Sequence, residues 1–138
     1  MVIASLQSKS PAADLFDEFD VAAATDITGF VLPGHLVEML RPANLAAVLD
    51  WDKLRLLPGA RELLAEGLQS TLAPANRHLE QEIDDGPALN LLSEYGILFD
   101  PQTCGGLLVG VSDGRAMAVL PRLQEIGYQA ELVGHTME

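Results

Sequence analysis

Cysteine and basic residues are scarce in this sequence, and each shortage excludes a class of protein. A single cysteine, Cys104, among 138 residues excludes an internal disulfide and a cysteine-based metal site. Eight lysines and arginines face 20 aspartates and glutamates, so the net charge is -12, and the arginines are scattered. Without a basic cluster, neither nucleic acid nor an anionic membrane surface is an expected partner. The acidic balance predicts a soluble surface of mutually repelling charges.

Long apolar runs and clustered histidines are missing as well. The sequence has no run of 18 or more apolar residues and no signal-like start, which predicts a cytoplasmic protein without membrane contact. His35, His78 and His135 are too far apart to show zinc-ligand spacing. Apolar residues nevertheless make up 49% of the chain, enough for the core of one ordered domain.

Hydrophobic periodicity predicts an α+β fold in which helices pack on a mixed β-sheet. Strands are expected at residues 21–25, 45–49, 97–99, 107–111 and 130–133. Helices are expected over 11–19, from an N-cap at Thr28 to Pro42, from Pro58 to Gly67, over 73–83 and 87–93, and from an N-cap at Ser112 to Gly127. The two strands on either side of residues 100–106 are expected to be antiparallel neighbours.

The first motif, Thr25–Phe30, has the residues of an anion and metal site. If a strand ends at Thr25 and a helix begins at Thr28, then Asp26 lies in the turn between them. Backbone N–H groups at a helix N-terminus favour an anion there, and Gly29 would let that anion approach. Asp26 is then a candidate Mg²⁺ ligand, with the metal bridging to phosphate oxygens. The alternative is that Asp26 and Thr28 only cap the helix.

The second motif, Asp100–Gly106, combines a carboxylate, a threonine and a glycine pair. The functional interpretation is that Gly105 and Gly106 leave backbone N–H groups open to an oxyanion. The structural alternative is an ordinary loop, since Asp-Pro and Gly-Gly pairs are common in turns. Only the fold decides whether the two motifs form one site.

Three further residues have both a functional and a structural interpretation. Cys104 is a candidate nucleophile or a small side chain in a tight loop. His35 lies on the apolar face of the helix after Asp26, which favours a core histidine over a ligand or base. Asn76 either caps a helix or reaches a ligand.

Several motifs occur in the order of a known family. They are Ala24–Phe30, Gly34–Leu36, Leu56–Ala60, Asn76-Arg77 and Leu98–Leu108, within a match from about residue 21 to residue 134. This series resembles the C-terminal domain of selenophosphate synthetase (selenide, water dikinase). That family belongs to the aminoimidazole-ribonucleotide-synthetase-like superfamily.

The resemblance implies a fold like the C-terminal domain of aminoimidazole ribonucleotide synthetase. It implies a two-domain, homodimeric, Mg²⁺-dependent enzyme that converts selenide, ATP and water to selenophosphate, AMP and phosphate. The family's N-terminal synthetase domain carries the glycine-rich loop, the reactive cysteine or selenocysteine and further metal-binding aspartates, and this sequence has none of them. We therefore expect a partly ordered segment at 1–20 and a single C-terminal domain at 21–138. We expect binding of Mg²⁺ and ATP only together with the N-terminal domain, and no activity without it.

Carried over by position, Asp26 matches the family's metal-binding aspartate. Cofactor-binding positions, by the same resemblance, are Thr25, Thr28, Gly29, Asp100, Gln102, Thr103, Gly105 and Gly106. No residue matches a catalytic group. Three residues depart from the pattern: Val31 replaces a glycine, Pro33 a leucine and Cys104 a serine.

Two other functions are compatible with these residues. One is a non-catalytic binding or interaction module derived from the family. The other is a different ATP-using member of the superfamily, such as a thiamine-phosphate kinase or a hydrogenase-maturation relative. The DPQT sequence of the second motif argues against that last assignment.

Overall fold

The computed structural model describes residues 8–19, 21–84, 86–90, 92, 94–112 and 114–138. Its helices are α2 (Ser10–Glu18), α3 (Val31–Leu40), α4 (Ala60–Ala65), α5 (Ala73–Asn76), α6 (Gly86–Leu89) and α7 (Ala116–Glu125). Its strands are β1 (Ala23–Asp26), β2 (Ala46–Leu49), β3 (Leu107–Gly110) and β4 (Gly134–Met137). Short 3₁₀ helices are η1 (Arg41–Ala43), η2 (Trp51–Lys53), η3 (Arg77–Glu82) and η4 (Tyr95–Phe99). The chain is therefore α+β, as the sequence predicts.

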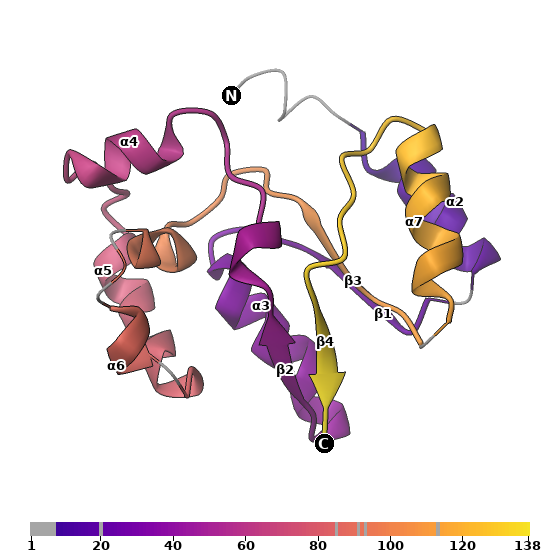
Figure 1. Cartoon of the computed structure of the whole chain (residues 1–138), viewed down its shortest axis with the longest axis horizontal. Coiled ribbons are helices and arrows are strands. Elements are labelled where there is room, and N and C mark those ends of the chain that lie inside the picture. Colours follow the sequence, from indigo (N-terminus) through magenta and orange to yellow (C-terminus); the bar gives the residue numbers. More distant parts are fainter. Residues whose placement is uncertain (1–7, 20, 85, 91, 93, 113) are drawn as a thin grey trace.

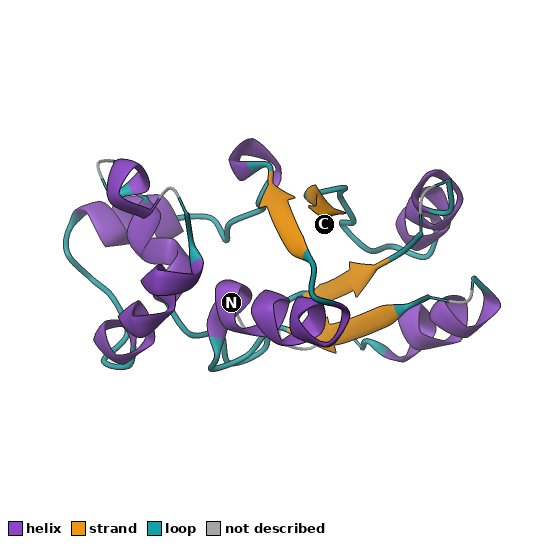
Figure 2. Cartoon of the chain, turned by 90° about the horizontal axis from the view of Figure 1, so that it is seen from below, coloured by secondary structure: helices purple, strands orange, loops and turns teal. Residues whose placement is uncertain are grey.

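Within the described residues, the strands pair as two antiparallel ribbons. β1 pairs with β3 so that Asp26 lies opposite Leu107, and β2 pairs with β4 so that Leu49 lies opposite Gly134. Figure 1 shows α2 and α7 side by side at one end of the molecule and α4, α5 and α6 at the other. Figure 2, from below, shows the strands between these two groups of helices.

The predicted strand at 97–99 is wrong, because these residues belong to the 3₁₀ helix η4. Tyr95, Leu98 and Phe99 are all buried and form the core cluster, and their spacing is helical rather than alternating. The Tyr95 and Phe99 rings meet edge to face with centroids 5.2 Å apart. Partly buried apolar residues pack around this cluster: Leu32, Trp51, Leu54, Leu79, Ile83 and Leu89. The second motif consequently follows a 3₁₀ helix and not a strand. The predicted pairing of two strands across residues 100–106 is therefore wrong, and β3 pairs with β1 instead.

The closing strand is also displaced from its predicted position. β4 begins at Gly134 rather than at residue 130, and Val133 ends the preceding segment by accepting a hydrogen bond from the Asp50 N–H at 2.8 Å. A Cβ at Gly134 would collide with the Val48 carbonyl oxygen. This close approach fixes the pairing of β2, and it outweighs the higher strand propensity of residues 130–133.

The predicted helices are present, but some of them begin later in the sequence than predicted. α7 contains Pro121 and ends before Gly127, whose φ of 92° suits the residue after a helix. It starts at Ala116 rather than directly after Ser112, and the Ser112 carbonyl accepts a hydrogen bond from the Arg115 N–H at 3.1 Å. The predictions for α2, α4 and the α5–η3 segment are confirmed.

Val31 begins α3 in a conformation that valine disfavours. Its φ is 58°, and its side chain is fully buried. A β-branched residue in this left-handed region is strained. The resemblance implies glycine at this position, and glycine adopts this φ without strain. Pro33 lies two residues later in the first turn, where a missing N–H is tolerated.

This strain predicts an unusual order of stability at position 31. Val31→Gly should be more stable than Val31→Ala by about 1 kcal/mol, because glycine enters the left-handed region without the roughly 1–2 kcal/mol penalty of other residues. At Val37, in the interior of the same helix, alanine should instead be the more stable by about 1 kcal/mol. Urea unfolding followed by circular dichroism measures both pairs. If alanine were more stable than glycine at position 31 as well as at position 37, the strain assigned to Val31 would be wrong.

Tyr95 has a raised pKa because of its surroundings. Burial is the larger cause, the Glu80 carboxylate adds to it, and the Arg77 guanidinium acts in the opposite direction. The Tyr95 side chain is 1% exposed, and its hydroxyl has no hydrogen-bond partner among the described residues. The Arg77 guanidinium carbon lies 5.4 Å from the centre of the Tyr95 ring.

We therefore expect stability to fall in alkaline solution through Tyr95. The folded chain holds the phenol neutral, so its contribution is complete below the ordinary pKa of 10.0 and is lost as pH rises through the raised value. Tyr95→Phe should show a shallower fall of the urea midpoint above pH 10 than the wild type does. Near-ultraviolet tyrosinate absorbance of Tyr128→Phe isolates the Tyr95 titration. A midpoint with equal pH dependence in both proteins would contradict this assignment.

Candidate functional site

The two motifs lie side by side as a continuation of the β1–β3 ribbon. The Ile27 N–H donates to the Gly106 carbonyl at 2.9 Å, and the Gly105 N–H donates to the Ile27 carbonyl at 3.1 Å. Further along, the Gln102 N–H donates to the Thr28 carbonyl at 3.2 Å. Segments far apart in the sequence thus form a single backbone-bonded unit at the end of β1.

The three motif glycines have different roles. A Cβ at Gly105 would lie 2.5 Å from the Ile27 carbonyl oxygen and 3.1 Å from the Gln102 Cβ. Only glycine therefore permits the close approach of the two motifs there. The Gly105 N–H already donates to the Ile27 carbonyl, so the prediction that it is open to an oxyanion is wrong. A Cβ at Gly29 or Gly106 would meet no atom within 4 Å. These two glycines leave open surface beside the ribbon, where a ligand can approach the backbone.

Asn76 joins the two motifs from α5. Its Nδ2 donates to the Gly29 carbonyl and to the Phe99 carbonyl, both at 3.2 Å. The residue is 9% exposed, so these bonds satisfy carbonyls that water reaches poorly. The amide nitrogen thereby holds the end of the first motif against the start of the second. Sequence reasoning named Asn76 without identifying this role, because the partners are backbone atoms of remote segments.

His35 holds the first motif from inside α3, as expected of a core histidine. Its Nε2 accepts a hydrogen bond from the Thr28 N–H at 3.1 Å and lies 3.1 Å from the Thr28 Oγ1. Because a backbone N–H only donates, this nitrogen is the acceptor, and the ring proton of the neutral form lies on Nδ1. Nδ1 lies 4.0 Å from a Glu38 oxygen. Thr28 therefore binds His35, and the prediction of Thr28 as N-cap is wrong since Phe30 precedes the helix.

Asp26 is the last residue of β1, opposite Leu107, so the prediction that it lies in the turn after the strand is wrong. Its carboxylate points away from the core at the junction of the motifs. Its side chain is 56% exposed, and one oxygen lies 3.5 Å from the Lys9 Nζ. The hydroxyl of the neighbouring Thr25 donates to the Asp26 carbonyl at 3.4 Å. Among the residues that the structure describes, no three histidine, cysteine, aspartate or glutamate side chains gather as a metal site. Asp26 can thus contribute one hard oxygen ligand, and Mg²⁺ commonly takes one or two carboxylates together with phosphate and water.

Some of the remaining residues of the second motif form hydrogen bonds that stabilise the loop, and others are exposed. The Asp100 Oδ1 accepts a hydrogen bond from the Ser70 N–H at 2.9 Å, and the Gln102 Nε2 donates to the Asp100 carbonyl at 3.1 Å. These two side chains therefore stabilise the loop. Thr103 and Gly106 are exposed, and Cys104 is half-buried.

A pocket of about 240 Å³ opens beside the glycine pair. Gly105 and Gly106 form part of its lining, Lys9 and Phe16 contribute from the α2 segment, and Tyr128 contributes from the loop after α7. We call this space the motif pocket. Lys9 is a functional candidate that sequence reasoning missed, because no pattern surrounds it; its one signal is that the chain has only two lysines.

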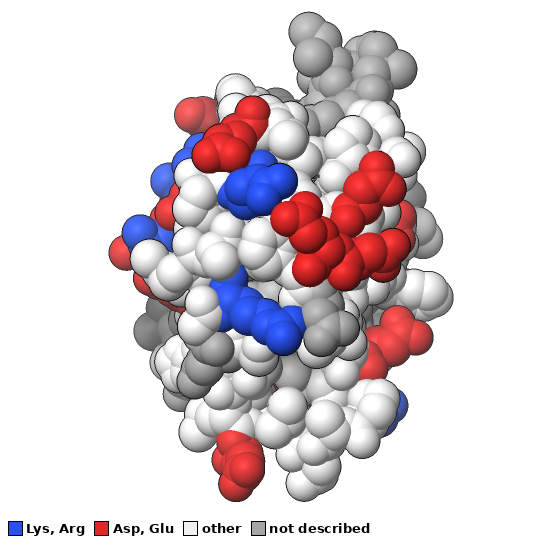
Figure 3. All heavy atoms as spheres, turned by 90° about the vertical axis from the view of Figure 1, so that its right-hand side faces the viewer, with Lys and Arg blue, Asp and Glu red and all other residues white. Residues whose placement is uncertain are grey.

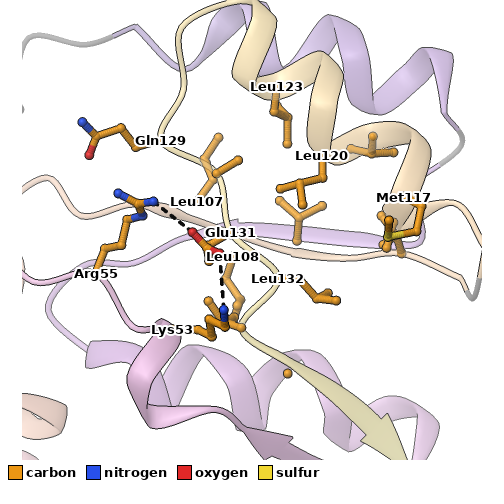
Figure 4. Close-up of a pocket in the computed structure, with 17 residues that line it drawn as sticks. Lys53, Arg55, Leu107, Leu108, Met117, Leu120, Leu123, Gln129, Glu131 and Leu132 are labelled. Atoms are coloured by element: carbon orange, nitrogen blue, oxygen red, sulfur yellow. Dashed lines mark hydrogen bonds and ion pairs between the residues drawn. The ribbon is translucent and has the colours of Figure 1, made fainter.

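A second hollow, of about 250 Å³, is mainly apolar and lies between β3, α7 and residues 129–134 (Figure 4). At its rim Glu131 lies 2.9 Å from the Arg55 guanidinium and 3.9 Å from the Lys53 Nζ. Because no residue of either motif lines this hollow, we place the candidate site at the motifs and not here.

The face formed by α2 and α7 carries both signs of charge (Figure 3). On it the Arg122 guanidinium lies 3.2 Å from the Glu18 carboxylate and 3.6 Å from the Glu125 carboxylate. Arg115 donates to the Phe19 carbonyl at 2.6 Å. These contacts join α7 to the N-terminal segment that also supplies Lys9.

None of the helices in the described part of the chain is both long and apolar enough to cross a lipid bilayer.

Comparison with known proteins gives consistent results. The family model described as "AIR synthase related protein, C-terminal domain" matches residues 4–138. A protein named selenide, water dikinase from Caldanaerobacter subterraneus subsp. tengcongensis is 35% identical over 131 residues, covering 92% of this chain and 37% of that protein. A protein of the same name from Nitratidesulfovibrio vulgaris is 35% identical over 128 residues, covering 92% and 36%. One from Shewanella putrefaciens is 49% identical over 94 residues, covering 67% and 25%. The chain thus spans little more than a third of these relatives at most.

Proposed function

The chain belongs to the AIR synthase related protein C-terminal-domain family, and from this membership we propose that it is the C-terminal domain of a selenophosphate synthetase. Such an enzyme converts selenide, ATP and water to selenophosphate, AMP and phosphate. One observation carries the proposal: two motifs typical of that enzyme lie side by side, with the exposed Asp26 carboxylate at their junction. An ATP-using reaction needs charge neutralisation and positioning at the phosphates more than it needs a nucleophile from this domain.

We propose that Asp26 is a Mg²⁺ ligand and that the nucleotide phosphates lie over Gly29 and Gly106. Mg²⁺, when bound, supplies positive charge to the phosphate oxygens. The exposed carboxylate and the two open glycines support this placement. His35 and Asn76 keep the first motif in position from the buried side. Thr103, which is exposed, and Thr25 and Thr28, which are half-buried, are further candidates for contact with the phosphates in this proposal.

The remaining functional groups belong, in this proposal, to an N-terminal synthetase domain. Asp26 supplies only one of the ligands of a metal ion, and the chain spans little more than a third of its relatives. The division into a segment at 1–20 and a domain at 21–138, the homodimeric full enzyme and the cytoplasmic location stay predictions. The domain alone is expected to be inactive.

Reconstitution tests the proposed function. Adding a synthetase N-terminal half in trans should give selenide-dependent AMP release, and Asp26→Ala should reduce it to background. Asp52→Ala, an exposed carboxylate on η2 away from the motifs, is the matched control and should retain activity. Activity that survives Asp26→Ala would make the metal role wrong. Turnover by the isolated chain would contradict its expected inactivity.

A non-catalytic module derived from this family is the second candidate. The observation that favours it is Val31, which keeps the glycine geometry of the motif but adds a buried side chain behind the site. If metal and nucleotide fail to bind in the presence of the N-terminal half, this candidate replaces the first.

A further inference from the structure

We propose that His35 makes the order of the first motif dependent on pH: the neutral ring holds the Thr28 N–H, and the protonated ring releases it. In the structure the ring is buried, and its Nε2 accepts a hydrogen bond from the Thr28 N–H at 3.1 Å. The inference concerns the conformation of the motif and goes beyond any ligand that the motif binds.

The neutral His35 ring leaves one of its two nitrogens without a partner. Because Nε2 accepts, the ring proton lies on Nδ1. Nδ1 is buried and has no hydrogen-bond partner among the described residues. A Glu38 oxygen lies 4.0 Å away, which is beyond hydrogen-bond distance. The neutral ring therefore bonds Thr28 at the cost of a buried, unpaired donor.

Protonation of His35 exchanges this unpaired donor for another. With a proton on both nitrogens, Nε2 no longer accepts from the Thr28 N–H. Its own N–H faces the Thr28 Oγ1, 3.1 Å away, which is able to accept. Glu38 follows one turn later on α3 with a side chain 79% exposed, so its carboxylate is free to turn toward Nδ1. The imidazolium is then bonded on both sides, and the Thr28 N–H is the unpaired donor.

The charged groups around α3 leave Glu38 as the partner of the protonated ring. α3 packs against β1, β2, η1, η3 and η4. Apart from the Tyr95 phenol, which is neutral below pH 10.0, the titratable and charged side chains of these elements have other partners. Asp26 binds Lys9, Arg41 binds Glu82, Arg77 binds Glu80, and the His78 ring bonds the Ala75 carbonyl. Among the described residues, Glu38 is the carboxylate within 4.0 Å of a His35 nitrogen.

The Thr28 N–H bond joins the first motif to α3, and other bonds join the same motif to the second one. The Thr28 carbonyl accepts from the Gln102 N–H at 3.2 Å, and the Gly29 carbonyl accepts from the Asn76 Nδ2 at 3.2 Å. These two bonds remain when His35 is protonated. We therefore expect a local opening at Thr28 rather than unfolding of the domain, over the range of about pH 8 to 5 in which histidine ordinarily changes charge.

Nuclear magnetic resonance of the 138-residue chain tests this inference. At about pH 8 the ring signals of His35 should show a proton on Nδ1 and none on Nε2. Hydrogen exchange of the Thr28 amide, expressed relative to an unstructured peptide at the same pH, should become about three- to tenfold less protected at about pH 5. The Met39 amide, inside α3, should keep its protection.

Three substitutions separate the role of His35 from a general effect of acid. His35→Gln offers an oxygen acceptor that does not titrate, so the protection of Thr28 should become independent of pH. Glu38→Gln removes the partner of the imidazolium and should shift the loss of protection to lower pH. His78→Gln is the matched control, because His78 is a half-buried histidine that bonds the Ala75 carbonyl instead of Thr28. It should leave the pH dependence at Thr28 unchanged.

Two results would overturn the inference. One is a ring proton on Nε2 of His35 at about pH 8, a measurement on the wild type that needs no variant to fold. The other is a Thr28 protection that changes with pH as much in His35→Gln as in the wild type, or that does not change in the wild type at all.

Discussion

Replacing Asn76 with aspartate is expected to lower the free energy of unfolding by about 3–5 kcal/mol. The two side chains have nearly the same shape, but the aspartate loses both hydrogen-bond donors. Its oxygens would then face the Gly29 and Phe99 carbonyls, which the Asn76 amide now binds at 3.2 Å. At 9% exposure, water compensates little for a buried charge surrounded by acceptors. The loss should appear as a lower midpoint in urea unfolding at neutral pH.

Asn90→Asp is the matched control for this substitution. Asn90 is exposed, and its Oδ1 accepts a hydrogen bond from Arg77 at 3.2 Å. An aspartate keeps that acceptor, so the free energy of unfolding should change by less than about 0.5 kcal/mol. A small effect at Asn76, similar to that at Asn90, would mean that Asn76 does not hold the motifs together.

Gly105→Ala is the second substitution with a large expected effect, a loss of about 3 kcal/mol in the free energy of unfolding. The new methyl group would lie 2.5 Å from the Ile27 carbonyl oxygen, a backbone atom that cannot rotate away. Relief requires the second motif to move off the first. That movement breaks the Gly105–Ile27 and Ile27–Gly106 hydrogen bonds, which measure 3.1 and 2.9 Å.

Gly106→Ala tests the same chemical change one residue later. A Cβ there meets no atom within 4 Å, and the φ angle is not in the left-handed region, so stability should change by less than about 0.5 kcal/mol. If Gly106 provides access for phosphate, its alanine variant should fold normally and, with the N-terminal half present, bind magnesium triphosphate more weakly. Equal destabilisation by both substitutions would contradict the close approach assigned to Gly105.

Much of this fold could be predicted from the sequence because local patterns and tertiary contacts agree. The short apolar runs at β1, β2 and β3 become strands. The apolar spacing in α3 and α7 gives helices, and Gly67 and Gly127 follow helix ends with positive φ angles. The family motifs predict Asp26 and the glycine pair as site residues before any geometry is known, and this role stays a prediction.

The errors arose where tertiary contacts outweighed local propensity. Residues 97–99 have strand-like composition, yet adding Tyr95 gives helical spacing for the three buried side chains. Leu132 and Val133 favour a strand. The backbone of β2, however, lies so close to residue 134 that only a glycine fits there, and β4 therefore begins at Gly134.

The candidate site was only partly predictable for a similar reason. Asn76 and His35 act on backbone atoms and on a neighbouring threonine, so their partners are visible only after folding. Lys9 approaches Asp26 because α2 packs beside α7, at the far end of the sequence. No local pattern encodes such contacts.

The proposal that Asp26 binds metal between two joined motifs is tested most directly by paramagnetic broadening of backbone amide signals. Mn²⁺ added in small amounts to the isotopically labelled chain, mixed with an unlabelled synthetase N-terminal half, should broaden the amides of Ile27 and Gly29 together with those of Gly105 and Gly106. Signals near Glu131 should stay sharp, and Asp26→Asn should abolish the effect. Broadening confined to one motif, centred on another carboxylate, or unchanged in Asp26→Asn would contradict a single metal site at this junction.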